Sequence, residues 1–186
     1  MKIFISGGCK NGKSYYAEHL AKAQSENLLY YIATMKPADN EDNERIERHR
    51  RERDGYGWTT IEQHADIEVI LDKCDHSGSF LLDSLTALLA NEMFLPDGSV
   101  NEWASEKITK GLSFVINNIK NIVIVSDYIY SDAKLYDAFT EEYRKSLAEI
   151  DREAARLCDI VLEASFANII VHKEGEAFIA AYNKIC

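Results

Sequence analysis

Short apolar segments alternate with longer segments of helical periodicity along most of the chain. The short segments are rich in β-branched and aromatic residues, as strands are, and they cover residues 2–6, 28–33, 58–61, 79–82, 122–125, 160–162, 169–171 and 178–180. Apolar residues recur every three or four positions over residues 14–23, 85–93, 108–119 and 136–157, which predicts amphipathic helices. Because strands and helices alternate, we predict an α/β fold: a mostly parallel sheet with helices on both faces and late antiparallel strands.

The sequence contains no sign of a domain boundary. It has 186 residues and two prolines, Pro37 and Pro96, and no repeat or low-complexity tract divides it. This length suits one domain with its own hydrophobic core. We therefore predict a single domain over residues 1–186.

Composition and charge narrow the range of partners. Hydrophobic residues make up 46% and charged residues 28% of the chain, which are globular proportions. The formal net charge of -10 disfavours non-specific binding to nucleic acid or to an anionic membrane surface. No apolar run approaches the ~18 residues that a membrane span needs, and the N-terminus lacks the apolar region of a signal peptide. We expect a cytoplasmic protein with no membrane span and no nucleic-acid partner.

The first predicted strand leads into a glycine-rich loop with the pattern G-x-x-x-x-G-K-S. The loop consists of Gly7, Gly8, Cys9, Lys10, Asn11, Gly12, Lys13 and Ser14. Glycines let the backbone wrap around a phosphate, and the N–H groups that open the next helix attract the anion. Lys13 can reach the β- and γ-phosphate oxygens, and the Ser14 hydroxyl can bind Mg²⁺. The pattern predicts a P-loop that binds ATP or GTP, with Lys13 as a candidate catalytic residue.

Asp83 ends another buried strand, where P-loop proteins place an acidic residue that holds Mg²⁺. The alternative role for Asp83 is the N-cap of the helix that begins at Ser84, and the sequence is compatible with both. We predict Ser14 and Asp83 as the magnesium ligands. The chain lacks suitably placed N-K-x-D and D-x-x-G segments, so a switch GTPase is disfavoured.

Residues 41–53 predict an arginine-rich helix, with five arginines, one histidine and a single aliphatic residue. One interpretation is a solvent-exposed helix with ion pairs such as Glu47–Arg51. The other starts from Arg45, His49 and Arg53, which are spaced by four and share one stripe. Two guanidinium groups can hold phosphate oxygens while a neutral imidazole attacks phosphorus or moves a proton. The remaining histidines have no such neighbours and are predicted to be surface or helix residues: His19, His64, His76 and His172.

Five short motifs follow one another in the first half of the chain. After the P-loop come Tyr-Ile-Ala-Thr at 31–34, Glu41 followed by R-I-x-x-H-R-x-x-R at 45–53, Trp-x-x-Ile-Glu at 58–62, and Leu-Asp-Ser-Leu-Thr at 82–86. In this order they resemble the bifunctional adenosylcobinamide kinase / adenosylcobinamide-phosphate guanylyltransferase family of cobalamin biosynthesis. The family usually has Asn-Glu-Val-Gly after the strand at 122–125, whereas this chain has Asp-Tyr-Ile-Tyr at 127–130.

The resemblance implies a RecA-like P-loop fold and two reactions in sequence. A nucleoside triphosphate phosphorylates the aminopropanol hydroxyl of adenosylcobinamide, and GMP is then transferred from GTP to that phosphate to give adenosylcobinamide-GDP. It implies that the GMP is carried on His49. It also implies further nucleotide-binding residues, namely Thr34, Arg45, Arg53, Glu62 and Asp83. The implied partners are a nucleoside triphosphate and a corrinoid, and the implied assembly is a homo-oligomer such as a trimer.

The sequence is also compatible with two other functions. The first is a kinase without the guanylyltransferase step, acting on a corrinoid or another small alcohol, because residues 127–130 depart from the family pattern. The second is a nucleotide-responsive regulatory protein, in which the P-loop controls conformation and no small molecule is phosphorylated.

Overall fold

The computed structural model describes residues 1–26, 28–37, 39–130, 132–166 and 168–174, without the side chains of Glu41, Asp42, Arg45, His49 and Glu52. Its strands are β1 (Lys2–Gly7), β2 (Leu29–Ala33), β3 (Trp58–Glu62), β4 (Ser79–Asp83), β5 (Asn121–Asp127), β6 (Ile160–Ser165) and β7 (Asn168–Lys173). Its α-helices are α1 (Lys13–Gln24), α2 (Asn40–Arg53), α3 (Leu85–Met93), α4 (Ala104–Asn118) and α5 (Ala138–Leu157), with a 3-10 helix at Ile67–Lys73. The strand predicted at 178–180 lies outside the described residues.

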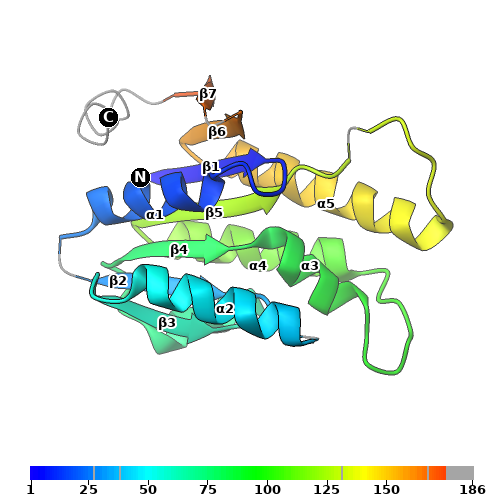
Figure 1. Ribbon diagram of the computed structural model, residues 1–186, viewed down its shortest axis with the longest axis horizontal. Helices are drawn as coiled ribbons and strands as arrows, with labels where there is room; N and C mark the ends of the chain where they lie inside the picture. The colour runs from blue at the N-terminus through cyan, green and yellow to red at the C-terminus, as the bar shows by residue number, and fades with distance from the viewer. Residues whose placement is uncertain (27, 38, 131, 167, 175–186) are drawn as a thin grey trace.

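The described strands form one seven-stranded sheet in the order β3-β2-β4-β5-β1-β6-β7 (Figure 1). Strands β1 to β6 pair in parallel, and β7 pairs antiparallel with β6. The mostly parallel sheet is therefore confirmed. The two late strands, β6 and β7, were both predicted to be antiparallel. The prediction is confirmed for β7, which pairs antiparallel with β6, and it is wrong for β6, which pairs parallel with β1.

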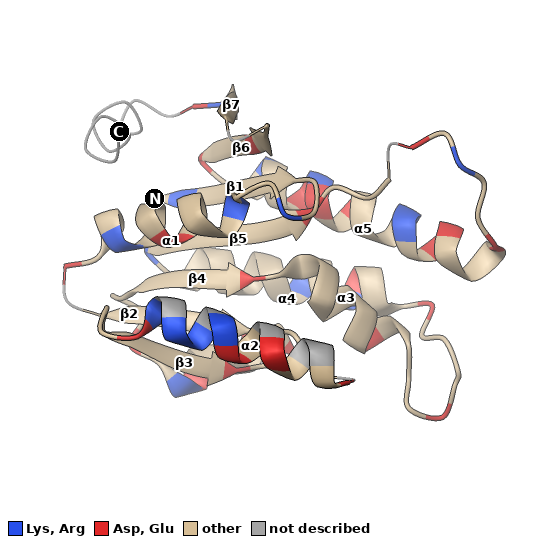
Figure 2. Cartoon of the chain, viewed as in Figure 1, with Lys and Arg blue, Asp and Glu red and all other residues tan. Residues whose placement is uncertain are grey.

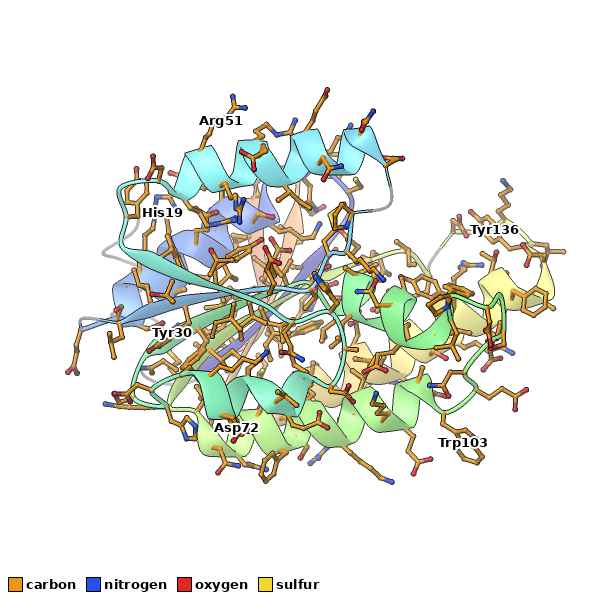
Figure 3. The ribbon with its side chains drawn as sticks, turned by 90° about the horizontal axis from the view of Figure 1, so that it is seen from below. His19, Tyr30, Arg51, Asp72, Trp103 and Tyr136 are labelled. Carbon is orange, nitrogen blue, oxygen red and sulfur yellow. The ribbon has the colours of Figure 1, made fainter. Side chains whose placement is uncertain are left out.

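Helices cover both faces of the sheet, as predicted. Helices α1 and α2 lie on one face, and α3, α4, α5 and the 3-10 helix lie on the other (Figure 3). Successive side chains of a strand point to opposite faces, so the apolar run of β5 contributes to both cores. Val123 and Val125 pack with Leu20 of α1, whereas Ile122 and Ile124 belong to the core beneath α3 to α5. None of the described helices is long and apolar enough to cross a membrane.

The parallel arrangement brings the carboxyl ends of strands β1 to β6 to one edge of the sheet. In register, Gly7 of β1 pairs with Asp127 of β5, and Ala33 of β2 lies between Glu62 of β3 and Asp83 of β4. In a parallel α/β sheet, ligands bind outside this edge. The residues that end these strands therefore delimit the candidate site.

Candidate active site

The glycine-rich loop connects the end of β1 to the start of α1, as the motif requires. Gly12 caps α1 with a φ of 87°, a left-handed conformation that favours glycine. Gly7 lies so close to β6 that a Cβ atom there would be 2.5 Å from the carbonyl oxygen of Ala164. Both glycines are thus required by the backbone, and together they leave the N-terminus of α1 open toward the carboxyl edge of the sheet, where an anion can bind.

Lys13 is buried at the start of α1, with 7% of its surface exposed. Its Nζ donates a hydrogen bond to the carbonyl oxygen of Gly8 over 3.1 Å and forms an ion pair with Oδ1 of Asp127 at 2.5 Å. The lysine is therefore held over the loop by a backbone carbonyl and by a carboxylate that the sequence analysis did not assign to the site.

Asp83 and Asp127 end the neighbouring strands β4 and β5. Asp83 Oδ2 accepts a hydrogen bond from the hydroxyl of Tyr31 over 2.9 Å. Burial is the main cause that raises the pKa of Tyr31 well above its ordinary value, and the negative charge of Asp83 is the second. The phenol therefore remains a hydrogen-bond donor at neutral pH. Backbone contacts fix Asp127, whose N–H donates to Thr86 Oγ1 over 2.8 Å. Two carboxylates thus face the P-loop from adjacent strand ends.

The N-cap of α3 is Ser84, and the interpretation of Asp83 as this cap is wrong. The Ser84 hydroxyl accepts the N–H of Ala87 over 3.3 Å. The chain is still extended at Ser84, so its side chain is the one that reaches the first turn. Asp83 is consequently free of a capping role and lies in the site together with Ser14.

A cavity of about 460 Å³ opens between these strand ends and helix α2. Lys13, Ser14, Asp83 and Asp127 line its P-loop side. Its other walls include Tyr31, Glu62, His64, Thr86 and Tyr143, together with Asn43, Ile46, Glu47, Arg50 and Arg53 of α2. The arginine-rich helix α2 therefore presents one face to the site, and the interpretation of a wholly solvent-exposed helix is wrong.

Arg53 is the most buried of the basic residues described on α2, at 7% exposed. Its guanidinium carbon lies 3.5 Å from the ring centroid of Tyr31, and its buried Nη1 has no hydrogen-bond partner among the described residues. Arg50 instead pairs with the exposed carboxylates of Glu47 at 3.3 Å and Glu62 at 3.6 Å. Figure 2 shows that basic residues gather along the C-terminal half of α2. A buried cation with an unused donor is suited to an anionic ligand.

Two residues of the predicted phosphate-handling stripe cannot be located in the cavity. The backbone of Arg45 and His49 is part of helix α2, but the side chains of these two residues lie outside the described part of the structure. Thr34 is fully buried, and its Oγ1 donates to the carbonyl oxygen of Ser84 over 2.8 Å and accepts the Ser84 N–H over 2.6 Å. The Thr34 side chain therefore fixes the start of α3 and does not line the cavity.

His64 is half-buried in the loop after β3 and lines the cavity, a role that was not predicted for it. Its Nδ1 contacts the carbonyl oxygen of Thr34 over 3.1 Å, and Asn91 Nδ2 donates to the same oxygen over 2.8 Å. Because a carbonyl only accepts, Nδ1 carries the proton here and a neutral ring keeps an unprotonated Nε2. Sequence reasoning missed His64 because it follows a short, weakly apolar strand. It missed Asp127 although the signal used for Asp83, an acid directly after a buried strand, was present.

The family model for cobinamide kinase / cobinamide phosphate guanyltransferase matches residues 3–166. The bifunctional adenosylcobalamin biosynthesis protein CobU of Escherichia coli is 33% identical over 123 residues, which are 64% of this chain and 66% of that protein. The corresponding protein CobP of Pseudomonas aeruginosa is 38% identical over 98 residues, or 52% of this chain and 56% of that protein. The matches thus span less than two thirds of these relatives' length.

Solved structures support the fold. The flagellar accessory protein FlaH from Methanocaldococcus jannaschii superposes with a TM-score of 0.52 at 14% identity, covering 94% of this chain and 79% of that chain. The protein PH0250 from Pyrococcus horikoshii also has a TM-score of 0.52, at 11% identity, with 96% of this chain and 88% of that chain covered. The P-loop between β1 and α1, the parallel sheet and these likenesses agree on an α/β P-loop fold. With the family match over residues 3–166, they lead to one conclusion: the chain belongs to the cobinamide kinase / cobinamide phosphate guanyltransferase family.

Proposed function

We propose that this protein catalyses both reactions of its family. In the first, a nucleoside triphosphate phosphorylates the aminopropanol hydroxyl of adenosylcobinamide. In the second, GMP from GTP is transferred to the new phosphate. The observation that carries the proposal is one cavity that joins the P-loop, with Lys13 and Ser14, to the arginine-rich helix α2. A phosphoryl-transfer enzyme needs little more than such positioning and charge stabilisation.

In the kinase step, the acceptor oxygen attacks the γ-phosphorus, the bond from that phosphorus to the β,γ-bridging oxygen breaks, and a nucleoside diphosphate leaves. Lys13 and the N-terminus of α1 hold the phosphates. Ser14 and Asp83 supply hydroxyl and carboxylate oxygens, the ligands that Mg²⁺ prefers, and both line the cavity. When bound there, Mg²⁺ neutralises charge that develops on the phosphate oxygens.

In the guanylyltransferase step, we assign the nucleophile to His49. A neutral imidazole nitrogen attacks the α-phosphorus of GTP, pyrophosphate leaves, and the phosphorylated acceptor then displaces the histidine. Arg53 can hold the phosphate oxygens in this step, because its buried guanidinium carries an unused donor next to the cavity. Glu62 also lines the cavity, and its carboxylate can accept N–H or hydroxyl donors of the nucleotide.

Intact mass spectrometry after incubation with GTP and Mg²⁺ tests the proposal. We expect one GMP on the protein, labile to acid and stable to base as a phosphoramidate is, and no GMP on His49→Ala. His19→Ala, a histidine of α1 outside the cavity, is the matched control and should carry the adduct. Lack of an adduct on parent protein that binds GTP would leave the kinase alone, and consumption of nucleotide that ignores added cobinamide would favour a regulatory protein. The oligomeric state remains a prediction, which light scattering after gel filtration measures.

A further inference from the structure

Asp127 lies at the carboxyl edge of the sheet and lines the cavity beside the P-loop. It ends β5 directly beside the P-loop strand, in register with Gly7. Hydrogen bonds from two backbone N–H groups fix this end of the strand: the Asp127 N–H donates to the side-chain oxygen Thr86 Oγ1 over 2.8 Å, and the Tyr128 N–H donates to the Gly7 carbonyl oxygen over 2.9 Å. Its carboxylate contacts Lys13 Nζ at 2.5 Å and is 24% exposed. The carboxylate is thus rigidly placed, faces the cavity and retains access to solvent.

The ion pair sets the distance between this carboxylate and a bound triphosphate. Lys13 also serves the β- and γ-phosphate oxygens, and charge-assisted N–H···O contacts are about 2.7–2.9 Å long. Because the three donors of an ammonium group diverge tetrahedrally, a lysine that contacts both groups holds the carboxylate roughly 4–5 Å from a phosphate oxygen. That gap fits one hydroxyl oxygen, hydrogen-bonded to the carboxylate and about 3–3.5 Å from phosphorus, which is the geometry for attack.

The other candidate bases are less suitable. Asp83 accepts a hydrogen bond from the hydroxyl of Tyr31, and it is one of the two magnesium ligands proposed above, with Ser14. The ring of His64 contacts the Thr34 carbonyl oxygen after β2, and two strand spacings separate β2 from β5, or about 10 Å at about 4.8 Å per strand. Among the described residues, Asp127 has Lys13 as its side-chain partner, and the ammonium group of Lys13, with three donors, can serve this carboxylate and a phosphate oxygen together.

We propose that Asp127 accepts the proton of the acceptor hydroxyl in the kinase step, an inference that rests on the proposed function. As the acceptor oxygen bonds to the γ-phosphorus, its proton passes to a carboxylate oxygen of Asp127. The bond from the γ-phosphorus to the bridging oxygen breaks, the electron pair leaves with the nucleoside diphosphate, and Asp127 later loses its proton to solvent. The guanylyltransferase step needs no such base, because its nucleophiles are a neutral imidazole and a phosphate. Asp127 should therefore matter to one reaction and not to the other.

The test is Asp127→Asn, which keeps the size of the side chain and an oxygen for Lys13. We expect the rate of cobinamide phosphorylation to fall by about 10²- to 10⁴-fold, the loss typical of a missing general base, while the GMP adduct still forms on the variant. Asp137→Asn is the matched control: Asp137 is the N-cap of α5, a position that asparagine also fills well, so its rate should equal the parent's.

A phosphorylation rate in Asp127→Asn close to that of the parent, with tighter nucleotide binding, would show that Asp127 only balances the charge of Lys13, and it would overturn the proposal. Hydrolysis of the triphosphate by water supplies a second readout, since water is also an acceptor hydroxyl. No cobinamide phosphate from the parent would refute the proposed function. Unchanged hydrolysis in Asp127→Asn would instead refute the role of Asp127, and a matching loss of hydrolysis would support it.

Discussion

Replacement of Arg53 by methionine separates the binding role of this arginine from its contribution to stability. Arg53 is 7% exposed, and its guanidinium stacks on Tyr31 at 3.5 Å. A desolvated cation–π contact stabilises by about 2 kcal/mol. Against it, the buried Nη1 without a partner among the described residues costs about 1–3 kcal/mol. Methionine retains most of the apolar volume of the side chain, so the free energy of unfolding should change by no more than about 1 kcal/mol.

The affinity for GTP should change much more. A charge-assisted hydrogen bond to a phosphate contributes about 1.5–3 kcal/mol, so its loss raises the Kd by about 10- to 150-fold. Isothermal titration with GTP and Mg²⁺ measures the Kd, and urea unfolding without nucleotide measures stability. Arg51→Met is the matched control on the same helix, because Arg51 points away from the sheet (Figure 3) and should leave both quantities unchanged.

The opposite result would refute this reasoning. If Arg53→Met lost more than about 2 kcal/mol of stability and bound GTP with the parent Kd, the guanidinium would serve the packing between α2 and β2. The buried, unused donor would then have no connection to the nucleotide.

Two further predictions concern buried or metal-binding carboxylates. Asp83→Asn keeps the size of the side chain but removes the charge that favours Mg²⁺, so the triphosphate-dependent rate should fall by about 10- to 100-fold; equal rates of parent and variant across a Mg²⁺ titration would remove Asp83 from the metal site. Burial raises the pKa of Asp151 from 3.8 to about 7. The Asp151 carboxyl loses its proton near pH 4 in the unfolded chain and near pH 7 in the folded protein. Its contribution to the free energy of unfolding is therefore highest below pH 4, where both states are protonated, and falls as the pH rises to 7. Asp151→Asn, neutral throughout, should gain stability relative to the parent by up to about 1.4 kcal/mol per pH unit in that window; urea unfolding at several pH values checks this, and a constant difference would contradict it.

The local features of the fold could be predicted from the sequence. Runs such as 122–125, without polar residues, indicate strands buried on both faces, and the periodicity of 108–119 indicates the helix found at Ala104–Asn118. The P-loop is equally local, because its glycines, Lys13 and Ser14 act within one strand, one turn and one helix. Asp83 was predicted at the site by the same logic of a polar residue directly after a buried strand.

The tertiary structure decided what depends on strand order and on the direction of side chains. Asp127 meets Lys13 because β5 pairs beside β1, although more than a hundred residues separate them. His64 joins the cavity because β3 pairs with β2, which brings it within reach of the Thr34 carbonyl. The cap of α3 falls on Ser84 because of its extended backbone, and α2 presents Arg53 to Tyr31 because of how the helix lies on the sheet. Hydrophobic periodicity specifies which residues are buried, but contacts between distant segments form only when the whole sheet assembles, and the site consists of such contacts.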